Sequence, residues 1–227
     1  MQINRTPNIG YPSVDCREVH TACLYKKEIN KIGDTFKNLV CAPDTENKIG
    51  TLPGIDANNG ISAVSIAETE DTGAFLGLTM IPEEGQSMTY GMRAVLSDKS
   101  TPDHPIVQVV SNLGGKKTIY NVDVNMVDPS NATQLEMFAL LSYADKTGSA
   151  NGGTFGLYQQ LKVYGKNASE IGYCHSLSGT DVFLHEKFDW TAMMQNMAQA
   201  YHAAGIEHQA KDCSILFDFL NTYINTK

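Results

Sequence analysis

An alternating segment that runs directly into a helical one constrains the fold more than any other stretch. Residues 116–127 alternate between apolar and polar side chains, as in a strand with one buried face. After a turn at residues 128–131, residues 132–144 carry an apolar stripe with helical spacing, and the stripe is broad enough to predict packing on two sides. A strand with one apolar face needs a cover. The segment therefore predicts a sheet packed against helices.

The residues before this segment predict further strands joined by short connections. We expect these strands over residues 61–67, 74–81, 87–96 and 106–111. Short connections join antiparallel neighbours, which predicts an antiparallel β-meander of four to five strands. In the last strand, the row predicted to face the helices is Tyr120, Val122, Val124 and Met126.

The residues after the turn predict a series of helices. We expect them over residues 132–144, 155–164, 167–172, 190–204 and 207–223, with residues 173–186 irregular. Ser130 or Asn131 is the expected N-cap of the first helix, and Gly165 is expected to end the second. Asp189 is the expected cap of the fourth, and the short turn at Gly205 predicts that the last two helices form a hairpin.

The fold class predicted by these elements is α+β, with the meander packed against C-terminal helices. Residues 1–14 are expected to form a flexible N-terminal arm, and residues 14–32 a helix with a thin apolar stripe. The length suits one sizeable core. We therefore expect residues 15–227 to form a single domain, strand-rich over 61–127 and helix-rich over 130–227.

Charge and composition narrow the function classes. The chain has 17 Lys and Arg against 25 Asp and Glu, a net charge of −8, which disfavours nucleic acid as a partner. No run approaches the about 18 apolar residues of a membrane helix, and the N-terminus lacks the apolar core of a secretory signal. We expect a cytoplasmic protein, or one exported without a classical signal peptide. The five cysteines are odd in number and without a C-x-x-C pair, which predicts reduced thiols.

One short region gathers most of the residues suited to catalysis. Within residues 174–186, Cys174 is a candidate nucleophile, His175 or His185 its base, and Asp181 the group that orients the base. This reading predicts a hydrolase. The alternative is a polar loop that covers the helix ends, and it is favoured because the G-x-S-x-G nucleophile motif is missing.

Metal and cofactor sites have weaker support in the sequence. His185 lacks a second histidine at metal-binding spacing, and His202 and His208 are separated by Gly205 rather than lying on one helical face. The glycine-rich residues 151–156 lack the lysine of a phosphate-binding loop and are expected to be a hinge. We therefore expect neither a metal nor a cofactor.

Three segments resemble a pattern shared by a family of uncharacterised bacterial proteins of about this size. These segments are residues 114–143, the Gly-Thr-Phe-Gly of residues 153–156, and residues 187–194. The resemblance extends over the C-terminal two thirds of the chain. It implies a domain of unknown function from a bacterium, and it carries over no catalytic residues.

Three functional hypotheses follow from the sequence. The first is a non-catalytic bacterial protein that acts by protein–protein interaction or self-association, since no motif of adequate specificity is present and sheet edges and faces can recruit partners. The second is a hydrolase that uses the region from Cys174 to Glu186. The third is a factor exported without a cleaved signal peptide.

Overall fold

The computed structural model describes residues 63–82, 89–112, 116–149, 156–174, 177 and 179–225. The predicted arm over 1–14 and helix over 14–32 lie outside these residues. In chain order the strands are β1 (Val64–Ala67), β2 (Phe75–Pro82), β3 (Thr89–Leu96), β4 (Ile106–Ser111) and β5 (Thr118–Asp123). The helices are the 3-10 turn η2 (Val124–Met126), α2 (Gln134–Thr147), α3 (Leu157–Glu170), α4 (Thr180–Leu184), α5 (Trp190–Ala203) and α6 (Glu207–Asn225).

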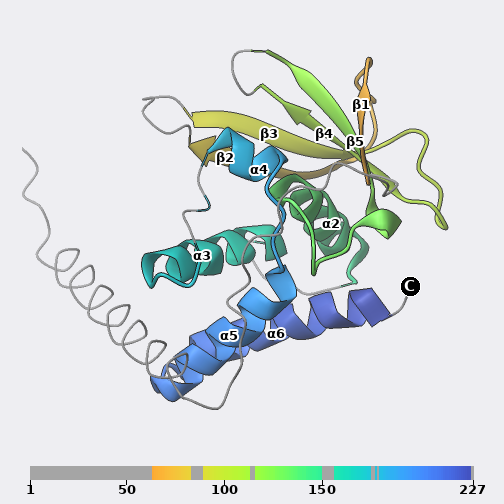
Figure 1. The fold of residues 1–227 in the computed structure, drawn as a ribbon. Coiled ribbons are helices and arrows are strands. Elements are labelled where there is room, and N and C mark those ends of the chain that lie inside the picture. The colour runs from red at the N-terminus through yellow and green to blue at the C-terminus, as the bar shows by residue number, and fades with distance from the viewer. Residues whose placement is uncertain are drawn as a thin grey trace, which may run out of the picture.

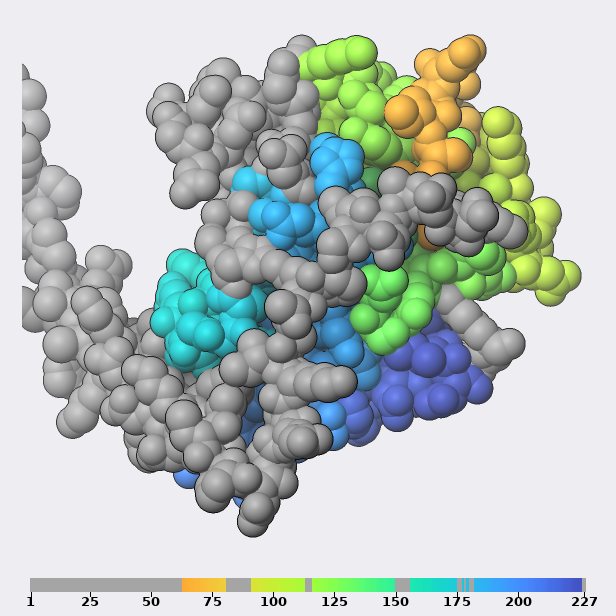
Figure 2. Space-filling model, viewed as in Figure 1, coloured from red at the N-terminus to blue at the C-terminus, as the bar shows by residue number. Residues whose placement is uncertain are grey.

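The elements form the predicted α+β fold, arranged in layers. Figure 1 shows the sheet at the top, helices α2 and α3 below it, and helices α5 and α6 at the bottom. The space-filling view in Figure 2 shows the strands and helix α6 at opposite ends of the same face. Helix α2 contacts strands on one side and α3 on the other, and so it links the layers.

The sheet has the strand order β1-β5-β4-β3-β2, and every neighbouring pair is antiparallel. Strands β2 to β5 form the predicted meander, and β1 joins it by pairing with β5. Residues 68–74 therefore cross the sheet on the face opposite α2, which we call the outer face. There the Gln108 side chain accepts a hydrogen bond from the Asp71 N–H at 2.7 Å and donates one to the Thr69 carbonyl at 3.2 Å.

The strand predicted over residues 116–127 is shorter in the structure. It ends at Asp123, whose side chain accepts a hydrogen bond from the Asn125 N–H at 3.0 Å and so favours the turn of η2. Three members of the predicted inner row pack in or against the core, namely Tyr120, Val122 and Val124. The fourth prediction is wrong, because the turn leaves Met126 43% exposed.

Helix α2 begins three residues later than a cap at Ser130 would place it. Its N-cap is Thr133, not Ser130 or Asn131. The Glu136 carboxylate accepts a hydrogen bond from the Thr133 N–H at 2.6 Å, and the Glu136 N–H donates to the Thr133 hydroxyl at 3.2 Å. This reciprocal capping box satisfies two N–H groups that the first turn would otherwise leave unpaired.

The core is centred on helix α2. Its large apolar side chains are at most 1% exposed: Leu135, Met137, Phe138, Leu140 and Leu141. The helix contacts β2, β3 and β4 above, and α3 and α4 beside it. The predicted packing on two sides is confirmed, because a helix so apolar around its circumference is stable only when it is enclosed.

Helix α3 is longer than predicted, because Gly165 does not end it. The helix continues to Glu170 and absorbs the separate helix predicted over residues 167–172. A Cβ atom at Gly165 would lie 2.8 Å from a methyl carbon of Leu177 and 3.6 Å from the Met193 methyl carbon. This glycine therefore permits close packing inside the helix rather than ending it.

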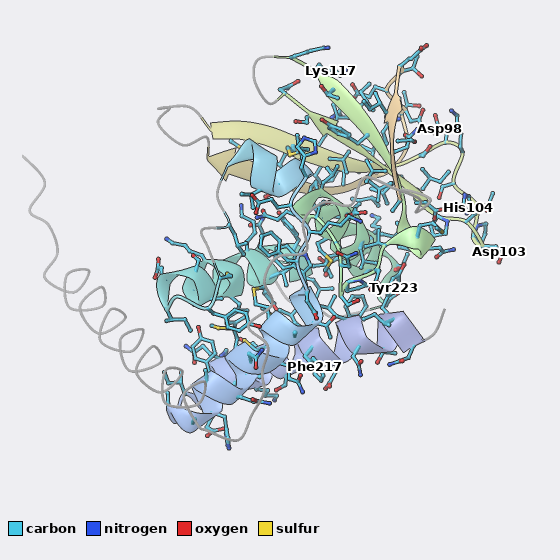
Figure 3. All side chains as sticks on the ribbon, in the orientation of Figure 1. Asp98, Asp103, His104, Lys117, Phe217 and Tyr223 are labelled. Atoms are coloured by element: carbon cyan, nitrogen blue, oxygen red, sulfur yellow. The ribbon has the colours of Figure 1, made fainter. Side chains whose placement is uncertain are left out.

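The C-terminal hairpin is confirmed. Asp189 caps α5 by accepting a hydrogen bond from the Ala192 N–H at 2.8 Å, and Gly205, with φ +73°, lies between α5 and α6. The indole N–H of Trp190 donates to the Ala132 carbonyl at 2.7 Å and ties the hairpin to the start of α2. In Figure 3, Tyr223 extends from α6 toward η2, where its hydroxyl donates to the Val124 carbonyl.

The helices differ from prediction at one further place. Residues 173–186 are not wholly irregular, since the short helix α4, of five residues, forms within them. Helix α6 is the longest described helix, with 19 residues. None of the helices in the described chain is both long and apolar enough to cross a membrane.

Candidate functional site

The residues predicted for hydrolysis are described only in part. Cys174 follows α3 and is half-buried, and burial raises the pKa of its thiol to about 11. The thiol is therefore protonated at neutral pH, which makes it a weak nucleophile unless a base is close. His185 follows α4 and is exposed. His175 and the side chain of Asp181 lie outside the description, so the proposed triad stays a prediction.

The other reactive side chains do not gather. Within the described ranges there is no group of three His, Cys, Asp or Glu residues placed to hold a metal ion. His202 pairs with Glu207 at 3.1 Å and His208 pairs separately with Asp212 at 3.2 Å. Cys213 is unpaired and fully buried, as expected of a reduced core thiol.

The loop between β3 and β4 carries several charged side chains. Figure 3 shows Asp98, Asp103 and His104 at the end of the sheet away from α3. The His104 imidazole lies 3.5 Å from the Asp123 carboxylate, and its side chain is 57% exposed. Ion pairs this exposed contribute little energy and bind little on their own.

A pocket of about 500 Å³ lies beside helix α3. Its walls come from α3, from the edge strand β2 and from the start of α5. Its apolar lining includes Leu161, Leu177 and Trp190, and β2 contributes Met80, whose carbonyl faces α3. Helix α3 also contributes polar residues to the lining, namely Tyr158, Gln159, Lys162, Lys166, Ser169 and Glu170. Ligand sites commonly combine such walls with a few polar groups.

Tyr158 is the most unusual polar group in this pocket. Its side chain is 4% exposed and packs edge-to-face on Phe138, with the ring centres 5.0 Å apart. Among the described residues its buried hydroxyl has no hydrogen-bond partner. Burial raises the pKa of the phenol, so that the group is a neutral donor. A buried polar group without a partner is costly, and it marks a position where a ligand can supply the missing acceptor.

Lys162 stands one helical turn after Tyr158. Its ammonium group donates to the Met80 carbonyl at 2.8 Å and to the Thr79 hydroxyl at 3.3 Å. Partial burial lowers its pKa. No Asp or Glu side chain of the described chain lies within ion-pair distance of this ammonium group. Among the described residues, its positive charge is therefore balanced only by the partial charges of the Met80 carbonyl and the Thr79 hydroxyl.

These contacts also close the edge of strand β2. Gln159 donates to the Leu78 carbonyl at 3.3 Å, two residues along the strand from the Met80 carbonyl that Lys162 holds. Edge carbonyls are the groups to which an added strand would bind. Helix α3 therefore protects this edge from strand addition.

The outer face of β2 is open. The β-bulge between Phe75 and Gly77 shifts the register, so that Phe75 shares a face with Leu78 and Met80. These three side chains are 58%, 58% and 46% exposed, and we call them the apolar strip. Their side chains point away from α2, because the opposite face of β2 carries Gly77, whose Cβ position faces Ser142.

Neither the pocket nor the apolar strip was predicted from the sequence. The spacing of Tyr158 and Lys162, four residues apart, was a usable signal, because it places both on one side of a helix. The strip gave no such signal, since its alternation is indistinguishable from that of a strand covered on that face, and the bulge that recruits Phe75 is not visible in the sequence.

Comparison with known proteins adds no further assignment. No protein-family model, no curated protein and no solved structure matches this chain.

Proposed function

We propose that this is a non-catalytic protein that binds another protein through the apolar strip of Phe75, Leu78 and Met80. The observation that carries the proposal is that all three large side chains are about half exposed on one face of one strand. Burying such a side chain fully is worth about 1.5–3 kcal/mol. Exposed apolar groups that are contiguous, rather than scattered singly, are typical of interaction surfaces.

The capped edge defines how a partner docks. Because Gln159 and Lys162 hold the Leu78 and Met80 carbonyls, a partner is expected to pack side chains on the outer face rather than add a strand. The chemistry of the partner follows from charge: this chain carries a net −8, so a partner with an apolar centre and a basic rim is complementary. The hydrolase hypothesis stays a prediction without an observation in its favour, and so does the resemblance to a bacterial family.

Site-specific photocrosslinking tests the proposal. A photoreactive amino acid at Leu78 in the full chain, expressed in its native cells, is expected to give a discrete covalent adduct, and the same group at exposed Lys211 on α6 is the control. Phe75→Glu is expected to abolish the adduct from position 78, and raised salt is expected to reduce it, because charge contributes to association.

The mass of the adduct distinguishes a second copy of this chain from another protein. An adduct of twice the chain mass makes the partner a second copy and removes the argument for a basic rim. The proposal is wrong if position 78 yields no adduct, or if positions 78 and 211 yield the same one. An adduct that persists in Phe75→Glu would also contradict it.

A further inference from the structure

We propose that the pocket beside α3 binds a small molecule made of an apolar body and a carboxylate, with the carboxylate between Tyr158 and Lys162. This inference goes beyond the proposed protein association, and it is tested through different side chains. It follows from the shape of the pocket, the uncompensated charge of Lys162 and the unpartnered hydroxyl of Tyr158.

The walls determine the body of the ligand. Leu161 and Trp190 are at most 2% exposed and Leu177 packs against the same core, so the inner surface is rigid and apolar. The volume of about 500 Å³ lies within the about 300–1,000 Å³ typical of small-molecule sites. An aliphatic chain or a single aromatic ring suits such walls, because its burial is favourable without requiring further polar partners.

Lys162 supplies the positive charge. An ammonium group has three N–H donors, and this one directs two of them to the Met80 carbonyl and the Thr79 hydroxyl. Lys162 lines the pocket, and no described carboxylate lies within ion-pair distance of it. Glu170, which also lines the pocket, pairs with Lys166 at 3.7 Å. A partly buried cation held only by neutral groups gains most from an anion that desolvates with it.

Tyr158 supplies the second donor. It precedes Lys162 by four residues, which places the two side chains on the same side of α3, about 5–6 Å apart at their Cβ atoms. Its O–H is buried and unpartnered within the described chain, so an acceptor that enters the pocket satisfies it. A carboxylate has two oxygens and can accept from both groups at once.

The charged groups around the pocket disfavour a phosphate as the ligand. A dianionic group is usually held by several cations or by a row of backbone N–H groups. The next lysine along this side of the helix, Lys166, is 75% exposed and already 3.7 Å from Glu170. One uncommitted cation with one hydroxyl matches a single negative charge.

The test is calorimetric titration of the full chain with octanoate, decanoate and phenylacetate, each compared with the corresponding uncharged alcohol. We expect at least one acid to bind, and to bind at least about tenfold more tightly than its alcohol. Tyr158→Phe is expected to weaken acid binding about fivefold and alcohol binding less, because an uncharged alcohol oxygen is a weaker acceptor than a carboxylate. Lys162→Met is expected to weaken acid binding about tenfold or more.

The controls separate lost binding from lost folding. Lys211→Met removes an exposed lysine on α6, which does not line the pocket, and is expected to leave acid affinity within about twofold. Lys162→Met also uncaps β2, so the conclusion depends on Tyr158→Phe, which keeps the shape of the side chain. The proposal is overturned if none of the three acids binds at millimolar concentration, or if Tyr158→Phe binds acids and alcohols as the unsubstituted chain does.

Discussion

The two faces of the same sheet are covered in different ways. The inner face is covered by α2, and its central residues, such as Met92, Val107 and Val109, are fully buried among apolar side chains. The outer face is crossed by residues 68–74, which are held by hydrogen bonds to Gln108 rather than by a helix. This segment joins β2 at Phe75, and Phe75, Leu78 and Met80 remain 58%, 58% and 46% exposed.

The comparison teaches that burial by itself does not distinguish a structural face from a functional one. Gln108 on the outer face is as buried as Phe138 beneath the inner face, each being 1% exposed. The difference is that the inner cover is apolar and continuous, whereas the outer cover is polar and incomplete. The incomplete cover leaves a surface that can bind a partner.

The largest effect is expected from Phe138→Asp, which attacks the inner cover. A charge placed in this core has no partner, so we expect a loss of more than about 4 kcal/mol and an unfolded protein. Circular dichroism and thermal denaturation measure it, with Val163→Asp at a 53% exposed position as control. A soluble variant with an unchanged thermal midpoint would show that α2 is not part of the core.

Gln108→Ala attacks the outer cover and is expected to cost less. It leaves the Asp71 N–H without its acceptor, and it leaves the Thr69 carbonyl and the side-chain oxygen of Asn121 without their donor. The free energy of unfolding should fall by about 2–3 kcal/mol. Urea denaturation measures the change, and Gln195→Ala, exposed on α5, should stay within about 0.5 kcal/mol. Equal values for the two variants would mean that the crossing segment does not depend on Gln108.

Tyr158→Phe is expected to change stability in the opposite direction. Removing a buried hydroxyl without a partner should stabilise the protein by about 1 kcal/mol in the absence of ligand. The matched control is Tyr164→Phe, whose hydroxyl donates to Asp212 at 3.0 Å and whose loss should destabilise by about 1 kcal/mol. If both variants are destabilised alike, the Tyr158 hydroxyl has a partner after all.

The smallest effect is expected from Leu78→Glu in the apolar strip. Because the side chain is 58% exposed, the free energy of unfolding should change by no more than about 0.5 kcal/mol, whereas Val109→Glu on the inner face should unfold the protein. Chemical denaturation of the isolated chain measures both. A large loss of stability in Leu78→Glu would show that the strip is structural.

Much of the fold could be predicted because it depends on local patterns. Strand β4 matches its predicted bounds, Asp189 caps the expected helix, and the hairpin of α5 and α6 follows from the turn at Gly205. Some errors came from local contacts that the pattern did not show, such as the Thr133–Glu136 capping box, and one came from contacts distant in sequence. Gly165 has the local character of a helix end, but its packing against Leu177 and Met193 keeps it inside α3.

The candidate sites were less predictable, because each is made by segments that are far apart in the chain. The pocket needs Met80 from β2 and Trp190 from α5 beside Lys162 from α3. Single positions such as Tyr158 carry no mark of being unpartnered in the sequence, since a hydroxyl has or lacks a partner only once its neighbours are placed. The cluster at residues 174–186 stays a prediction, since His175 and the side chain of Asp181 lie outside the described residues.

The amino-acid sequence by itself determined that an antiparallel sheet would be covered by the helices that follow it, because alternation and helical spacing state which side of each element avoids water. Only the tertiary structure decided which groups would be left exposed or unsatisfied. Placing β1 beside β5 sends residues 68–74 across the outer face. The packing of α3 on β2 leaves Tyr158 without an acceptor and Lys162 without an anion among the residues that the structure describes. Exposed apolar groups and unpartnered polar groups are properties of the complete tertiary structure, since each depends on which groups all the neighbouring elements place around it.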